Sequence, residues 1–147
     1  VNIVRLVGWY HRGIWQKPLL WSLYIAFLGM CVSFVLYALQ PWLGYNHSIA
    51  VHGLSISGIG MMTVAMMARV SLGHTGRSIH QPPKIVNAMF ALMAVAFVSR
   101  VFLPLIDMSH YLLWIMLAQS AWIACFALFC ISYLPILARP RPDGLFG

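Results

Sequence analysis

The fold is decided by residues 48–70, which read SIAVHGLSISGIGMMTVAMMARV. An α-helix rises ~1.5 Å per residue and the hydrocarbon layer of a membrane is ~30 Å thick, so about 20 apolar residues cross it. The stretch carries no charge before Arg69, near its end. It therefore predicts a membrane-spanning helix, and the rest of the chain repeats the pattern.

Three further apolar runs are long enough to span a membrane, at residues 18–40, 84–106 and 110–137. Proline, glycine and polar residues separate them, as turns between helices require. After the last run, residues 139–144 read RPRPDG and predict an extended tail. The sequence predicts an all-α transmembrane bundle of four helices, forming one membrane domain over residues 1–147.

Composition supports this class and excludes others. The chain is 62% hydrophobic and only 7% charged, whereas soluble domains carry about 25% charged residues. The net charge is +7, and the basic residues lie near helix ends, where their side chains contact lipid phosphates. The sequence shows no polar, basic face of the kind that binds nucleic acid. The expected partner is the lipid bilayer, with no nucleic acid; a homo-oligomer is left open.

Lys and Arg residues also predict orientation. In the four-span topology all of them except Arg100 fall on one side of the membrane. The positive-inside rule then places both termini and the 71–83 loop in the cytoplasm. Residues 1–17 mix apolar and basic side chains, and we interpret them either as an interfacial helix or as the end of an earlier span.

Small residues form stripes on the first two spans. Such stripes let helix backbones approach closely, and they predict tight antiparallel packing. The stripes are Ser22, Ala26, Gly29 and Ser33 on the first span, and Gly53, Ser57 and Gly60 on the second.

His52 is the strongest candidate for a functional side chain. It lies ~7.5 Å into the second span, where an imidazole is costly unless it is satisfied. It falls about 100° round an ideal helix from Gly53, above Ile59, Thr63 and Met66 on one face. We expect a buried ring, either hydrogen-bonded to a facing group or bound to a metal or cofactor.

Two other residues belong to the same half of the bundle. His110 opens the fourth span, and it is either a helix-end residue or a partner of His52 in a bis-histidine haem site. Arg100 is interpreted as paired with Asp107, as reaching to headgroups, or as a contact to an anion such as a haem propionate.

At the opposite end, residues 69–77 read RVSLGHTGR. The glycines permit a positive φ and close backbone approach, so a compact polar turn is expected. This turn is either a loop folded over its own helix end, with Arg69 and Arg77 on lipid phosphate, or a built polar site.

Several of these strings resemble the NnrS family. They are AVHGL at 50–54, G-x-GM at 58–61 and MARVSLGHTGR at 67–77, with KPLLW at 17–21 and RPRPDG at 139–144. Members are bacterial inner-membrane proteins described as containing haem and copper and linked to nitric oxide stress and denitrification. They have about twelve spans, so the resemblance implies a C-terminal part of a longer protein, whose remaining spans are partners.

The resemblance implies haem b and copper as cofactors, with His52 and His74 as metal ligands and Arg69 and Arg77 as cofactor-binding candidates. Relatives often carry a histidine shortly after the KPLLW string, where this chain has Tyr24, which makes Tyr24 a candidate ligand. Because other ligands then lie elsewhere, we expect little haem on these residues alone.

The leading functional interpretation is a haem- and copper-binding membrane protein of the nitric oxide response, whether it senses, stores, delivers or catalyses. The alternative is a transporter or permease-like module whose buried His and Arg serve a substrate or proton path. A third is a structural helical module of a respiratory complex.

Overall fold

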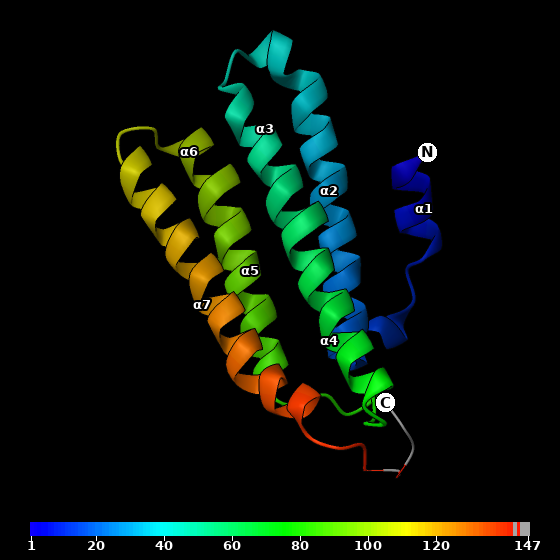
Figure 1. Cartoon of the computed structure of the whole chain (residues 1–147). Helices are drawn as coiled ribbons and strands as arrows, with labels where there is room; N and C mark the ends of the chain where they lie inside the picture. Colours follow the sequence, from blue (N-terminus) through cyan, green and yellow to red (C-terminus); the bar gives the residue numbers. More distant parts are fainter. Residues whose placement is uncertain (143, 145–147) are drawn as a thin grey trace.

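Four long apolar helices form the molecule (Figure 1). The computed structural model describes residues 1–142 and 144, and within these all regular structure is helical. The four span candidates are Pro18–Leu43, His47–His74, Ile85–Ile106 and Tyr111–Ala138. They agree with the predicted spans to within a few residues, so the all-α membrane bundle is confirmed. Asp143 of the predicted tail lies outside the described residues.

The helices alternate in direction along the chain (Figure 1). The first span is α2 (Pro18–Leu43), and the second joins α3 (His47–Leu54), a π-helical segment η2 (Ser55–Met61) and α4 (Met62–His74). The third joins α5 (Ile85–Val101) to the short α6 (Leu103–Ile106), and the fourth is α7 (Tyr111–Ala138). We call the end where α2 and α5 begin and α4 and α7 end the basic end. The opposite end, with the 44–46 and 107–110 connections, is the turn end.

The N-terminal residues form α1 (Asn2–Gly8) and a 3₁₀ turn, η1 (Arg12–Gln16). Leu6 of α1 packs with Phe27 and Cys31 from the middle of α2, and Trp9 lies against Phe27 with ring centroids 5.2 Å apart. Apolar burial against α2 therefore holds α1 along that helix and not across its end (Figure 1).

Proline explains where α2 begins and fails to explain where it ends. Lys17 is extended, as a residue before proline prefers, and Pro18 occupies the first turn. The predicted span ends at residue 40, just before Pro41, yet α2 continues to Leu43 and closes at Gly44, whose φ is +68°. A proline this near the C-terminus removes one backbone donor while the helix has only two residues left to run.

The predicted stripes pack α2 against the second span. Ser22, Ala26, Gly29 and Ser33 are all buried. A Cβ built on Gly29 would lie 2.7 Å from Ser57 Cβ, and one built on Gly53 would lie 2.4 Å from Ser33 Oγ. Since carbon atoms in contact normally lie near 3.5 Å, only glycine permits this approach.

The main apolar core lies between two pairs of helices, α2 with the second span and α5 with α7. It includes Val64, Phe90, Met93, Cys125 and Tyr133. Trp122 of α7 reaches across to η2, where a Cβ on Gly60 would lie 2.3 Å from its ring. The π-helical turn was not predicted, because the sequence of residues 55–61 reads as an ordinary apolar helix. Segments of this kind occur frequently at functional sites.

Candidate functional site

A buried arginine is the centre of the polar cluster at the turn end. Arg100, near the end of α5, is only 8% exposed. Its Nη1 donates to Tyr111 Oη at 3.2 Å and its Nη2 donates to Ser48 Oγ at 3.3 Å. The guanidinium carbon also lies 5.6 Å from the centre of the Tyr111 ring. Among the described residues no carboxylate contacts this cation, because Asp107 binds Ser109 and His110 instead.

His52 meets the same arginine from the second span. Arg100 Nη2 lies 3.4 Å from His52 Nε2 and 3.5 Å from Nδ1. His52 Nδ1 is also 2.7 Å from the carbonyl of Ser48, one helical turn earlier. A carbonyl only accepts, so Nδ1 carries the proton, and in the neutral ring the lone pair is on Nε2. The hydrogen bond of Nδ1 is thus made within its own helix and not to a facing carbonyl or hydroxyl as predicted, and the facing group that contacts the ring is Arg100.

The predicted burial of His52 is wrong, since the residue is exposed. Its ring borders an open hollow of about 610 Å³ between the second span and α7. Arg100, Gln119 and Trp122 line the same hollow. Arg100, in contrast to His52, is buried although it lines the same hollow.

The π-helical segment changes which residues share the face of His52. Ser55 and Ile56 line the hollow beside it. Thr63 and Met66, predicted to continue that face, line a separate hollow. A π-helix bonds each residue to the fifth one on, so the seven residues of η2 rotate everything after them relative to an α-helix.

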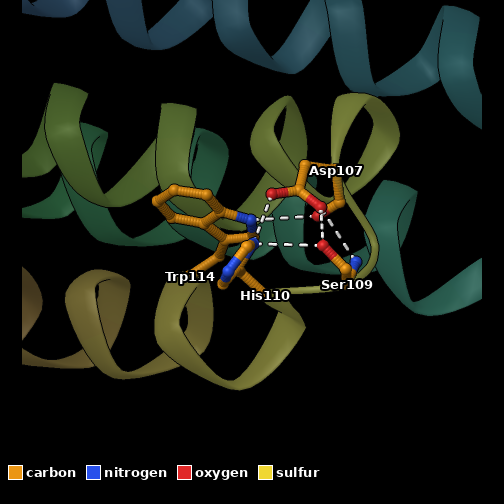
Figure 2. A network of polar contacts seen from close by, with 4 residues as sticks. All are labelled: Asp107, Ser109, His110 and Trp114. Atoms are coloured by element: carbon orange, nitrogen blue, oxygen red, sulfur yellow. Dashed lines mark hydrogen bonds and ion pairs between the residues drawn. The ribbon is translucent and has the colours of Figure 1, made fainter.

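His110 is held by its own loop at the turn end (Figure 2). Its Nδ1 lies 2.7 Å from Asp107 Oδ2, and Ser109 donates its hydroxyl to the other oxygen of that carboxylate. Trp114 Nε1 donates to the carbonyl of Asp107 at 3.0 Å. Hydrogen bonds from Ser109 and His110 lower the pKa of Asp107 to about 2. These contacts describe a helix-end residue, and no contact joins His110 to His52 in the described structure.

Tyr24 faces away from this cluster. Its ring lies 6.0 Å from Tyr10 and 6.1 Å from Trp15, between centroids, and both partners belong to the N-terminal segment. The structure therefore separates Tyr24 from His52, and the remaining candidates lie at the basic end.

The RVSLGHTGR string forms the end of α4. Gly76 adopts φ +68°, and the N–H of Arg77 donates to Leu72 O at 2.9 Å while that of Gly76 donates to Gly73 O at 3.3 Å. This pattern is a Schellman motif, which satisfies the last carbonyls of a helix. The glycine-based turn is confirmed, and Gly76 is the residue that provides it.

Two arginines form hydrogen bonds between the C-terminal ends of α4 and α7. Arg77 Nη1 donates to Ile136 O at 3.2 Å, and Arg141 Nη1 donates to His74 O at 3.1 Å. Each arginine follows one helix and caps the C-terminus of the other. The sequence analysis did not predict this pairing. The feature that could have indicated it is Pro140, because a proline has no N–H to donate to the Ile136 carbonyl four residues earlier.

The described residues fit part of a cofactor site. His52 Nε2, held in orientation by the bond from Nδ1, suits one iron-ligand position, and Arg100, whose Nη2 now lies 3.4 Å from Nε2, would turn to a carboxylate. No group of three or more His, Cys, Asp or Glu side chains within residues 1–142 and 144 is arranged to hold a metal ion. His74 has an exposed ring, and Arg69 has no hydrogen bond or ion pair in this part of the chain.

Comparison with known families matches residues 1–141 to the family described as NnrS protein. No curated protein and no solved structure matches the chain. The family is associated with haem and copper. The match of this chain to the family supports a membrane protein related to nitric oxide. With four spanning helices and a match over nearly its whole length, this chain belongs to the NnrS family.

Proposed function

We propose that this chain contributes one haem-binding position to a bacterial inner-membrane protein of the nitric oxide response. His52 would supply the iron ligand, and Arg100 would bind a propionate. The observation that supports this is the contact between them: a buried cation without a carboxylate partner in the described residues touches an imidazole that opens into a hollow. A buried charge of this kind calls for an anion.

When bound, haem supplies the redox and gas-binding chemistry, while the protein sets its ligation and access. In this proposal Ser48 fixes the His52 ring through its carbonyl, and Tyr111 orients the guanidinium of Arg100. The positive-inside rule places the basic end in the cytoplasm and this cluster near the outer surface. His110, His74 and Tyr24 remain candidate ligands, and Arg69 and Arg77 remain candidate cofactor contacts, in a site that other spans would complete. Copper needs such additional ligands.

The test is the absorption spectrum and metal content of the intact protein purified from haem-replete cells. His52→Ala should abolish or shift the Soret band, and Arg100→Gln should weaken haem retention. His47→Ala is the matched control, because this exposed histidine on the same helix lies against the Tyr37 ring and makes no hydrogen bond or ion pair among the described residues. An unchanged spectrum in His52→Ala would show that His52 is not a ligand.

A transporter-like module is the second candidate, favoured by the same buried arginine in an open hollow. A colourless, metal-free preparation would support it. In that case Arg100→Gln should abolish uptake of an anionic substrate into vesicles. The absorption spectrum should not change, because the protein without the substitution also has no Soret band.

A further inference from the structure

A groove runs along the exposed face of η2 and α4, away from the His52 hollow. One open hollow of about 370 Å³ is lined by Gly58, Met62, Thr63, Met66, Met67 and Val70. A second, of about 310 Å³, continues it to the basic end and is lined by Met66, Arg69, Val70, Gly73, His74 and Ile79. Since Met66 and Val70 border both, they form one feature, which we call the α4 groove.

The groove is apolar along its length and cationic at one end. Met66 and Val70 are 44% and 45% exposed, and they line both hollows. Arg69 stands at the basic end and is half-buried, without a hydrogen bond or ion pair among the described residues. The exposed ring of His74 lies one turn further on. An amphipathic ligand with an anionic head complements this distribution of charge.

The length of the groove identifies the kind of ligand. Gly58 lies near the middle of the second span, and the rise from there to Arg69 is roughly 15 Å. This is half of the ~30 Å hydrocarbon layer, the depth of one leaflet. A docked transmembrane helix would need a groove through the full thickness, whereas one acyl chain needs only a leaflet.

We propose that the α4 groove binds one anionic phospholipid, with its phosphate on Arg69 and an acyl chain along Val70, Met66 and Met62. Gly73 leaves room for the headgroup, because a Cβ placed there meets nothing within 4 Å. The site is separate from the His52 and Arg100 position, since no residue of the groove lines the hollow at His52.

The test is native mass spectrometry of the full chain in detergent, titrated with phosphatidylglycerol or phosphatidylcholine. Phosphatidylglycerol should bind preferentially, and Arg69→Gln should weaken it about fivefold, the effect of one basic residue near anionic lipid. Arg139→Gln is the matched control, as it removes an exposed charge from the same end but outside the groove. Gly73→Leu should also weaken binding, by filling the headgroup space, and its Cβ meets nothing within 4 Å.

Four outcomes would overturn the proposal. Equal losses in Arg69→Gln and Arg139→Gln would indicate general surface charge, and no loss in Arg69→Gln would remove the headgroup contact. Displacement of the lipid by excess inorganic phosphate would indicate a site for free anions. A photo-crosslinker at Thr63 should capture lipid, and capture of a peptide would mean that a protein segment covers the groove instead.

Discussion

Arg77 Nη1 donates to the main-chain carbonyl of Ile136 at 3.2 Å, across a separation of 59 residues. Pro140 stands where the helix would otherwise present a donor to that carbonyl. A guanidinium at this position also interacts favourably with the negative end of the α7 dipole. This hydrogen bond and the one from Arg141 to His74 O together join the C-terminal ends of α4 and α7 at the basic end.

Loss of the Arg77 side chain should loosen this connection. We expect Arg77→Ala to lower the free energy of unfolding by about 1 kcal/mol, because a charged donor to an orphan carbonyl is lost from a half-exposed site. Titration of the detergent-solubilised protein with SDS measures the change. Arg139→Ala should stay within about 0.5 kcal/mol, and an equal cost in both variants would mean that net charge matters and not the bond.

The two glycines at the end of α4, Gly73 and Gly76, should respond to alanine substitution in opposite directions. Gly76→Ala should destabilise by about 1 kcal/mol, because alanine is strained at a positive φ. Gly73→Ala should stabilise by about 0.5–1 kcal/mol, since that residue is helical and a Cβ there is unobstructed. The same SDS titration distinguishes them, and a stable Gly76→Ala would contradict the Schellman assignment.

Close packing at the π-helical segment makes Gly60 intolerant of a side chain. A Cβ there would lie 2.3 Å from Trp122 and 2.7 Å from Met93 Cε, so Gly60→Ala should cost about 1–3 kcal/mol through overpacking. Gly58→Ala is the control within the same segment, because its Cβ would meet Met30 Sδ at an ordinary 3.5 Å. Thermal unfolding midpoints should fall for the first variant only.

The loop at the turn end should keep Asp107 ionised at unusually low pH. Its pKa is about 2 because Ser109 and His110 donate to the carboxylate. A lowered folded-state pKa stabilises the loop at any pH above the unfolded value of ~3.9, and this stabilisation is lost as pH falls from about 4 to 2. Carbon-13 NMR of the Asp107 carboxyl should show its pKa rising in Ser109→Ala and His110→Ala; a titration that stays near 2 in both would contradict the network.

Local patterns in the sequence predicted much of this structure. Apolar run length gave the four spans, and small residues at helical spacing correctly marked the faces on which Gly29 meets Ser57 and Gly53 meets Ser33. The turn at Gly76 followed from glycine chemistry. Each of these features depends on residues a few positions apart, or on the uniform preference of lipid for apolar side chains.

Features that join distant segments were not predictable in the same way. The contact of His52 with Arg100 spans 48 residues, and that of Arg77 with Ile136 spans 59. His52 is exposed against the prediction, while Arg100 beside it is buried. Burial depends on which helix lies opposite, and no single span encodes its neighbour.

By itself the sequence determined a four-helix membrane bundle, its close-packed faces and its family. Only the tertiary structure decided that residues 55–61 form a π-helix and that Arg100 contacts Ser48, His52 and Tyr111. It also decided that Arg77 and Arg141 each bind a carbonyl at the C-terminus of the other's helix. The physical reason is that partitioning into lipid acts on each segment separately. Hydrogen bonds between helices, by contrast, depend on the rotation and depth at which those segments pack together.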